Sequence, residues 1–285
     1  MMTPSKIITS SASARMSEVK NLAGRHFRKK HSTTLVEGPQ ALREALEYYP
    51  DSLRDIYMSP QAAQRYDSLA YRASLKHYFH YVDGSLFSQI APQAQGICAT
   101  FDMKAFKSVD PSFVFSFTLK TKRPLIVLPH TQDPGNMGAM IRVGDAAGAS
   151  AIIACPGGAD PLSPKVIRMS AGSIFHLPVI TTMNFSQVAQ ALHQHGICLL
   201  GADGHGQRTL FDKELSEFYK PHAWIFGNEA QGLDTEQQKA CDTLVRIPLY
   251  GKAESLNVSQ ACSICVYESV RRQIADVARI ETSDR

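Results

Sequence analysis

Five short apolar runs recur in the second half of the chain, and they restrict its fold more than any other feature. The runs occupy residues 125–128, 151–154, 197–200, 224–226 and 244–247. Between them, apolar residues follow helical spacing at 136–148, 185–195, 235–241 and 257–275. Short uninterrupted apolar runs are typical of parallel strands covered on both faces. The alternation therefore predicts a doubly wound α/β domain built on a parallel sheet.

The first half of the chain alternates in the same way, but less strongly. We expect strands at 33–37, 55–59, 78–82 and 96–101, and helices at 15–31, 38–49 and 61–75. Residues 102–122 break this rhythm and have the character of a linker. A chain of 285 residues has room for two domains. The expected organisation is a small α/β domain over residues 1–110, a linker over 111–122 and a second domain over 123–285.

The N-terminal residues 1–19 are rich in serine and contain no acidic residue before Glu18. This composition suits either a targeting segment or a frayed tail, and the poor amphipathic pattern favours the tail. No apolar run approaches the roughly 20 residues that a membrane-spanning helix needs. We therefore do not expect the chain to cross a membrane.

Basic residues are concentrated in the first half of the chain. Residues 1–120 contain 15 Lys and Arg against 10 Asp and Glu, whereas residues 121–285 contain 15 against 16. A cluster lies at Arg25, Arg28, Lys29 and Lys30. Excess positive charge indicates an anionic partner, with nucleic acid as the first candidate. A basic surface that simply faces water is the alternative.

The cysteines and histidines show no pattern of a redox or metal site. Five of the six cysteines lie in or beside apolar segments, and Cys262 and Cys265 stand inside a helical pattern rather than at a helix start. We expect this pair to be buried and reduced. The ten histidines are scattered, and the pair His193 and His195 is flanked by no carboxylate or cysteine cluster, so no metal is expected.

Three polar segments follow apolar runs and contain the residues most suited to bind a ligand. They are Asp-Pro-Gly-Asn-Met-Gly-Ala-Met-Ile-Arg at 133–142, Gly-Asn-Glu-Ala-Gln-Gly at 227–232, and Arg-Ile-Pro-Leu-Tyr-Gly-Lys-Ala-Glu-Ser-Leu-Asn-Val-Ser at 246–259. Open α/β sheets bind ligands at the carboxyl ends of their strands, which is where these segments begin. Taken alone, the first segment is equally well explained as a tight turn and helix cap, and the second is better explained as a surface turn. In the third, a helix cap explains one of Ser255 and Asn257 but not both.

Taken together and in this order, the three segments resemble the signature motifs of the SpoU/TrmH family of RNA ribose methyltransferases. The first motif is matched by Asn136, Gly138 and Arg142, and the second by Gly227, Glu229 and Gly232. The third is matched by Ile247, Pro248, Gly251 and residues 255–259. Residues 165–178, which include Arg168, also resemble the family's segment after the first motif. Residues 28–39 resemble, more weakly, the start of a ribosomal-protein-like RNA-binding domain.

The resemblance implies a SPOUT fold, in which a parallel sheet is followed by a C-terminal segment threaded into a trefoil knot. It implies that S-adenosylmethionine binds to the loops after two strands, with Gly227, Ile247, Leu249 and Leu256 lining the adenosyl pocket. It also implies a homodimer whose two subunits both contribute to the active site.

The reaction that the resemblance implies is methyl transfer to a ribose 2′-oxygen of RNA. Its catalytic set would be Arg142, Asn136, Glu229, Ser255 and Asn257, and its RNA contacts would include Arg25, Arg28, Lys29, Lys30 and Arg168. Arginine stays protonated in proteins, so we expect Arg142 to hold a phosphate and stabilise charge on the 2′-oxygen rather than to act as a base.

Large-subunit ribosomal RNA is the expected substrate because the chain has the additional N-terminal domain. A tRNA ribose methyltransferase is the alternative enzyme, and a non-catalytic RNA-binding paralogue or ribosome assembly factor is the alternative of another class. An enzyme that modifies ribosomal RNA is expected in the cytoplasm.

Overall fold

The computed structural model describes residues 7–283, and for residues 107–108 and 275–283 it describes the backbone alone. The chain forms two compact units. One consists of Met1–Ser108 together with Asp160–His176, and the other of Val109–Ala159 together with Leu177–Arg285. We describe each unit by itself.

The first unit contains a five-stranded mixed sheet. Its strands, in spatial order, are β1 (Ile7–Ile8), β4 (Tyr78–Val82), β3 (Leu53–Met58), β5 (Ile97–Asp102) and β2 (Thr33–Glu37). Strands β1, β4 and β3 are parallel, whereas β5 is antiparallel to both β3 and β2. Its helices are α1 (Ala14–Asn21), α2 (Arg25–His31), α3 (Pro39–Tyr48), α4 (Pro60–Arg65), α5 (Asp67–Ser74), α6 (Gly84–Ile90) and α9 (Pro164–Met169), with short 3-10 turns η1 (Pro50–Ser52), η2 (Met103–Ser108) and η3 (Ser173–Phe175).

The N-terminal tail expected over residues 1–19 is wrong for the part that the structure describes. Strand β1 pairs with β4, and Met16 and Val19 of α1 are buried in an apolar cluster with Leu22 and Leu86. The expected helix over residues 15–31 is two helices, because Gly24 takes an extended conformation and starts α2. Residues 1–6 lie outside the described part of the chain. For them, the structure does not distinguish a tail from a targeting segment.

Segment 160–176 packs with the first unit although the sequence placed it in the second domain. Thr34 Oγ1 donates to the carbonyl oxygen of Leu162 at 2.7 Å, and Phe175 lies among the rings of Tyr49, Phe101 and Phe106. These rings are otherwise left at one end of the sheet, so the returning segment completes their burial. Periodicity along the chain contains no signal for such a long-range contact.

The second unit is built on a seven-stranded sheet that is parallel throughout. Its strands, in spatial order, are β10 (Arg208–Thr209), β12 (Thr243–Arg246), β9 (Cys198–Ala202), β11 (His222–Phe226), β6 (Leu125–Leu128), β7 (Ala151–Ala154) and β8 (Val179–Ile180). Every pairing between neighbours is parallel. The predicted parallel α/β sheet is therefore confirmed, and the trefoil knot stays a prediction.

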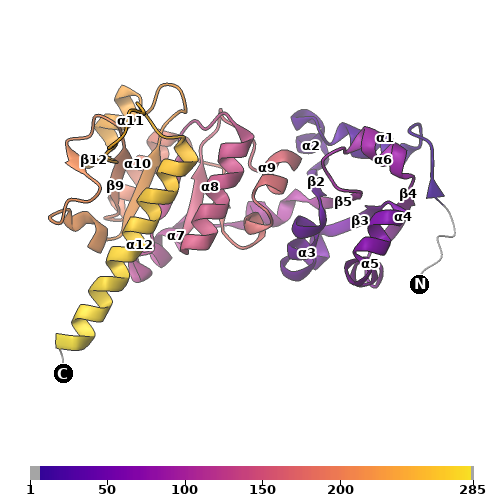
Figure 1. The fold of residues 1–285 in the computed structure, drawn as a ribbon, viewed down its shortest axis with the longest axis horizontal. Coiled ribbons are helices and arrows are strands. Elements are labelled where there is room, and N and C mark those ends of the chain that lie inside the picture. The colour runs from indigo at the N-terminus through magenta and orange to yellow at the C-terminus, as the bar shows by residue number, and fades with distance from the viewer. Residues whose placement is uncertain (1–6, 284–285) are drawn as a thin grey trace. The chain divides into compact units, whose positions relative to one another are not determined.

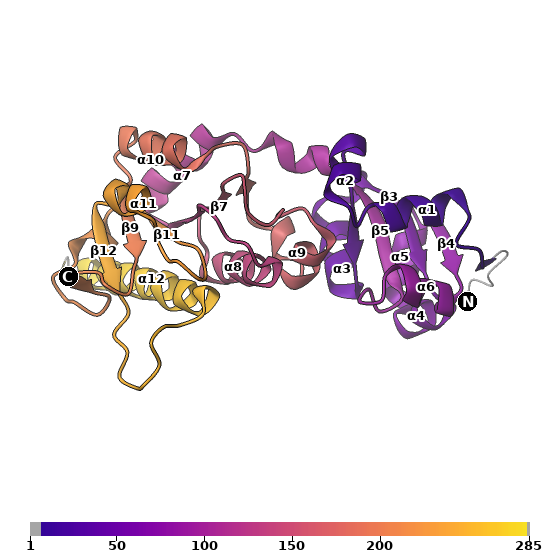
Figure 2. The same cartoon turned by 90° about the horizontal axis from the view of Figure 1, so that it is seen from above.

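Helices cover both faces of this sheet. They are α7 (Pro111–Thr121), α8 (Pro134–Ala147), α10 (Phe185–Gln194), α11 (Thr235–Ala240) and α12 (Val258–Ser283), with the 3-10 turn η4 (Ser216–Tyr219). In the second unit, Figure 2 shows α7, α10 and α11 on one face and α8 and α12 on the other. Residues 111–122, for which we expected a linker, form α7 and bury Val114 and Phe115 in the core.

Alternate residues of the central strands explain this two-sided core. Val127, Ile153 and Ile225 belong to the cluster beneath α7 and α10. Their neighbours Ile126 and Ile152 face α8, since a Cβ added to Gly144 of α8 would lie 3.2 Å from the side chain of each. Successive side chains of a strand point to opposite faces, and here both faces are apolar because both are covered.

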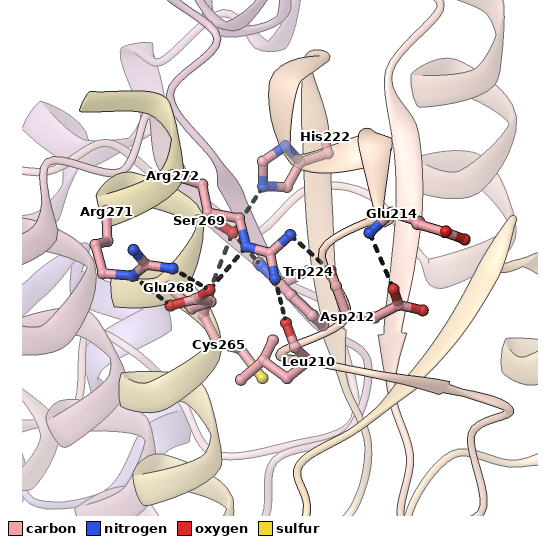
Figure 3. Close-up of polar contacts among 10 residues, drawn as sticks. All are labelled: Leu210, Asp212, Glu214, His222, Trp224, Cys265, Glu268, Ser269, Arg271 and Arg272. Carbon is pink, nitrogen blue, oxygen red and sulfur yellow. Dashed lines mark hydrogen bonds and ion pairs between the residues drawn. The ribbon is translucent and has the colours of Figure 1, made fainter. Parts of the chain in front are cut away.

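The C-terminal helix α12 lies beside α8 (Figure 1) and is held by a buried polar network (Figure 3). Ser269 Oγ accepts from Trp224 Nε1 at 2.8 Å and lies 2.9 Å from His222 Nε2. Arg272 donates to the carbonyl oxygens of Leu210 and Asp212 and to Glu268 Oε1. These contacts join α12 to β11 and to the loop after β10.

No helix among the described residues is long and apolar enough to cross a bilayer.

Candidate active site

The polar residues of the three predicted motifs meet at the carboxyl edge of the parallel sheet. The first motif starts α8 after β6, the second follows β11, and the third connects β12 to α12. Because β6 and β11 are neighbours in the sheet, their following loops lie side by side. Parallel strands thus bring together segments that are about a hundred residues apart in the sequence.

The start of α8 is fixed by an N-cap. Asp133 Oδ1 accepts from the backbone N–H of Asn136 at 2.9 Å, and Pro134 occupies the first helical turn. Asp is a favoured N-cap and proline suits the first helical position. Asn136 therefore occupies a defined place one turn into the helix.

The loop after β11 is a tight turn closed by its own backbone. Asn228 and Gly232 exchange two backbone hydrogen bonds of 2.9 Å each, and Asn228 Oδ1 accepts from Ala230 N at 2.8 Å. Gly232 has φ +69°, a left-handed conformation that favours glycine. A Cβ on Gly227 would lie 2.2 Å from the backbone carbon and oxygen of Gly232, so this turn closes only without a side chain at Gly227.

Glu229 links the two loops. Its Oε1 accepts from Asn136 Nδ2 at 3.2 Å and from Asp133 N at 3.3 Å, and its Oε2 accepts from Gln132 N at 3.3 Å. Burial raises the pKa of this carboxyl, but hydrogen bonds from its own backbone N–H, Asn136, Asp133 and Gln132 outweigh that effect. The net pKa is below the usual value, so Glu229 is a carboxylate at neutral pH.

Asn257 brings the third motif into the same cluster. Its Nδ2 donates to Asn136 Oδ1 at 3.0 Å, and its own Oδ1 accepts from Ser259 N and Ser259 Oγ. The amide of Asn136 therefore donates to Glu229 and accepts from Asn257, which fixes its orientation. One hydrogen-bonded chain runs through all three motifs.

Arg142 lies six residues after Asn136, about 9 Å further along the α8 axis. Its side chain is exposed because Met140, Ile141 and Gly144 occupy the face of α8 that packs on the sheet. Among the residues that the structure describes, the guanidinium of Arg142 has no hydrogen bond or ion pair. It is available for an anionic ligand.

The predicted cofactor residues lie in the loops that follow β11 and β12. Residues 247–257 form no helix or strand, and Leu249 and Tyr250 are 41% and 90% exposed. Ile247 and Leu256 are half-buried, and Gly227 adds no side chain. Uncovered apolar side chains beside strand ends suit an adenosyl group. Ser255 is exposed in this loop, and within the described part of the chain its hydroxyl has no partner.

The predicted RNA-contacting residues separate into two groups. Arg25, Lys29 and Lys30 are exposed on α2. Arg28 is only 2% exposed, and it donates to the carbonyls of Leu22 and Ala23 and to Asp160 Oδ2. We therefore correct the prediction for Arg28, whose guanidinium holds parts of the first unit together and does not face solvent.

Arg168 is likewise engaged inside the first unit. It forms an ion pair with the buried carboxyl of Glu37 at the end of β2. Burial raises the pKa of Glu37 by more than Arg168 lowers it, so the carboxyl depends on this partner. The family resemblance implied that Arg168 binds RNA, and this stays a prediction. No feature of the sequence indicated that Arg168 pairs with Glu37.

The structure adds residues that the motifs did not single out. Gln132 and Asp133 donate backbone N–H groups to Glu229, and Asn228 shapes the turn that presents it. The Asp-Pro pair at 133–134 is a readable helix-start signal. Nothing in the sequence shows that these N–H groups point at Glu229.

A seven-stranded parallel sheet with a polar cluster at its carboxyl edge defines a doubly wound α/β protein that binds a ligand there. Comparison with known proteins specifies this class further. The SpoU rRNA Methylase family matches residues 123–267. The chain is 30% identical over 248 residues to the 23S rRNA (guanosine-2′-O-)-methyltransferase RlmB of Bordetella pertussis, covering 85% of this chain and 98% of that protein.

Another relative is the 23S rRNA (guanosine(2553)-2′-O)-methyltransferase RlmP of Bacillus subtilis. It is 30% identical over 262 residues, which is 92% of this chain and 98% of that protein. Among solved structures, the SpoU methyltransferase AviRb of Streptomyces viridochromogenes in complex with AdoMet has a TM-score of 0.79 at 26% identity, covering 92% of this chain and all of AviRb. The chain belongs to the SpoU rRNA methylase family, which confirms the family predicted from the three motifs.

Proposed function

We propose that this protein transfers a methyl group from S-adenosylmethionine to the ribose 2′-oxygen of a guanosine in large-subunit ribosomal RNA. Family membership makes it an RNA ribose methyltransferase, and both full-length relatives described above are named for guanosine in 23S rRNA. The observation that carries the proposal is the hydrogen-bonded chain Asn257–Asn136–Glu229, which joins residues of all three motifs. Arg142, further along α8, has no partner among the described residues and is available to the RNA.

The chain's own residues fit the cofactor in the second unit. Ile247, Leu249 and Leu256 would contact the adenosyl group, and Gly227 would allow its close approach to backbone. When bound, S-adenosylmethionine supplies an activated methyl group on a sulfonium. The protein contributes to methyl transfer by positioning the reacting groups and by placing charges around them.

The geometry suggests a division of work among the polar residues. Glu229 has a lowered pKa and stays ionised, so it serves as a fixed hydrogen-bond acceptor rather than as a strong base. Asn136 and Asn257 orient the groups around it. Arg142 clamps the phosphate next to the target ribose and stabilises negative charge that develops on the 2′-oxygen. Ser255 adds a hydroxyl to this site from the third motif.

The first unit is proposed to bind RNA. Its exposed Arg25, Lys29 and Lys30 present three positive charges on one short helix. Phosphate contacts of this kind add affinity without sequence selectivity.

We further propose a homodimer that acts in the cytoplasm. On α12, which lies beside α8, Tyr267 and Ile274 are 50% and 65% exposed. A second copy of the chain would cover these exposed apolar side chains. Light scattering, which measures the mass in solution, tests the homodimer. Ribosomal RNA as substrate supports the cytoplasmic location.

Incubation with tritiated S-adenosylmethionine and total RNA from a strain lacking the protein tests the function. We expect label in 23S rRNA as 2′-O-methylguanosine, and none with Asn136→Ala. Label in tRNA would support the alternative enzyme. Failure of the wild-type protein to label any RNA would favour a non-catalytic RNA-binding protein.

A further inference from the structure

A second polar cavity lies on the other side of the loops that form the candidate active site. Its volume is about 370 Å³, within the range of small-molecule sites. The lining comes from the ends of β6, β7 and β11 and from the starts of α10 and α11, namely Pro129, His130, Cys155, Pro156, Phe185, Asn228, Gln231, Gly232, Asp234, Glu236 and Gln237. None of the residues assigned above to catalysis or to the cofactor lines it.

Two loops separate this cavity from the catalytic cluster. His130 and Asn228 line the cavity, whereas Gln132 and Glu229 on the same two loops belong to the cluster. Asn228 Nδ2 donates to the carbonyl oxygen of His130 at 3.4 Å, which ties the loops together. Asn136 of the cluster belongs to α8, whereas the starts of α10 and α11 line the cavity. Figure 2 shows α8 on one face of the sheet and α10 and α11 on the other. A nucleotide that straddles this edge has its ribose on one side and its base on the other.

Gln237 provides the cavity with a hydrogen-bond donor whose position is fixed by a capping box. Its side chain is only 8% exposed, and its Oε1 accepts from Asp234 N at 3.2 Å in a capping box. The amide nitrogen of Gln237 has no partner among the residues that the structure describes. The residue is largely buried, but Nε2 itself is not an enclosed atom, so it can donate to a ligand that enters the cavity.

Two other residues of the lining are carboxylates, which only accept, whereas His130, Asn228 and Gln231 have mixed donor and acceptor groups. Asp234 Oδ1 accepts from Gln237 N at 2.8 Å, which leaves its second carboxylate oxygen unoccupied within the described chain. The exposed carboxylate of Glu236 is also on the lining. Two carboxylates disfavour a phosphate here. Phe185 supplies an aromatic ring, and such rings stack on unpaired bases in RNA recognition.

An amide donor beside carboxylate acceptors matches one nucleobase edge. Guanine presents an acceptor at O6 next to donors at N1–H and the 2-amino group. Adenine presents a lone pair at N1 toward the carboxylate, and uracil has no amino donor there. We propose that this cavity binds the guanine base of the nucleotide that is methylated, with Gln237 donating to O6 and Asp234 accepting from the N1 and 2-amino groups. This inference rests on the proposed function and names its specificity residues.

Gln237→Glu is the sharpest test, because Glu keeps the capping oxygen and replaces only the donor. Gln187→Glu is the matched control, since Gln187 holds the same capping-box position in α10 and is not on the lining. Asp234→Asn is a second variant that removes the charge but retains a good N-cap. Thermal melting checks that all three variants fold.

Binding of free guanosine, adenosine and inosine is measured by saturation-transfer NMR without any methyl donor. We expect wild type and Gln187→Glu to prefer guanosine over both others by about tenfold. Gln237→Glu should lose the preference over adenosine because the donor to O6 is gone, and Asp234→Asn should lose the preference over inosine because an acceptor for the 2-amino group becomes a donor. Equal binding of guanosine and adenosine by wild type would overturn the proposal. Displacement of guanosine by S-adenosylhomocysteine would also overturn it, by assigning the cavity to the cofactor.

Methyl transfer to 23S rRNA by the same variants separates the two hypotheses. A raised KM with Gln237→Glu, together with lost guanosine preference, supports the base site. If wild type methylates rRNA and Gln237→Glu retains both the guanosine preference and the KM, the base site is wrong while the enzyme function stands. If wild type transfers no methyl group, the proposed function itself is wrong, whatever the nucleosides do.

Discussion

Asn136 illustrates how much a single amide contributes to the site. It donates to Glu229 in the second motif and accepts from Asn257 in the third, at 3.2 and 3.0 Å. The sequence around Asn136 predicted the start of a helix. That local prediction explains why the backbone N–H of Asn136 is bonded to Asp133, but it does not explain the contacts of the side chain. The side-chain contacts need residues about a hundred positions away.

Arg142→Lys tests whether the guanidinium fork matters beyond its charge. We expect turnover to fall by roughly tenfold or more, because a charged hydrogen bond contributes about 1.5–3 kcal/mol. Single-turnover methylation with saturating cofactor measures the effect. Arg123→Lys is the control, since Arg123 is exposed before the amino end of β6, whereas the site lies at the carboxyl edge of the sheet. Near-wild-type turnover of Arg142→Lys would contradict a bidentate clamp.

Gly227→Ala tests the geometry of the turn that presents Glu229. The added methyl would lie 2.2 Å from the Gly232 backbone, so the turn must open and Glu229 must move. We expect turnover to drop by roughly 100-fold, the effect of a displacement near 1 Å. Methylation assays with urea unfolding of the same samples separate this loss from unfolding. Gly204→Ala should be silent, because no atom lies within 4 Å of its Cβ position. Full activity of Gly227→Ala would show that the turn tolerates opening.

At the scale of elements, most strands are where their apolar runs predicted them. Strands β6 and β7 have the predicted bounds, and β4 does so in the first unit. The strands β8 and β10, of two residues each, escaped prediction because so short a segment has no measurable period. Helix α9 was not predicted either, because its six residues form less than two turns and show no clear helical period.

The docking of α12 depends on a histidine without charge. His222, drawn beside Ser269 in Figure 3, is fully buried. Its Nδ1 lies 2.8 Å from the Lys220 carbonyl, which can only accept. Nδ1 therefore carries the proton, and Nε2 accepts from the Ser269 hydroxyl. Burial lowers the pKa of His222 to about 4, although the Lys220 carbonyl and Glu217 act in the opposite direction.

We expect stability to fall as the pH decreases from 6.5 toward 4. In that range the unfolded histidine binds a proton that the folded one excludes, so the free energy of unfolding decreases with decreasing pH. Between pH 7.5 and 5 the loss is about 2 kcal/mol, measured by urea unfolding. His222→Gln should flatten this dependence, whereas His195→Gln, at an exposed ring, should not. An unchanged pH profile in His222→Gln would contradict the assignment.

At the scale of the whole molecule, the chain leaves the second unit at residue 159 and returns at 177. The intervening residues complete the first unit through Arg28–Asp160 and Arg168–Glu37. The basic cluster near residue 28 is thus divided: one arginine is structural, and three neighbouring cations face solvent.

The three solvent-facing cations are expected to contact RNA phosphates. Replacing Arg25, Lys29 and Lys30 with Gln should weaken RNA binding and reduce the slope of log affinity against log salt by roughly 2. Filter binding of 23S rRNA at several salt concentrations measures both quantities. The same change at Lys213, Lys220 and Lys239, exposed in the second unit, provides the charge-matched control. An unchanged slope in the first variant would exclude α2 from the RNA contacts.

The parallel α/β class, the family and the identity of the motif residues all follow from the amino-acid sequence alone. These properties are local, since an apolar run or a spaced motif is complete within a dozen residues. Only the tertiary structure decided which residues meet: Gln132 and Asp133 at Glu229, the buried pairing of Arg28, and the amide of Gln237 in a cavity. These contacts join residues that are far apart in the sequence. They form because of the order of the strands in the sheet and because residues 160–176 pack with the first unit, and neither property can be read from a local pattern.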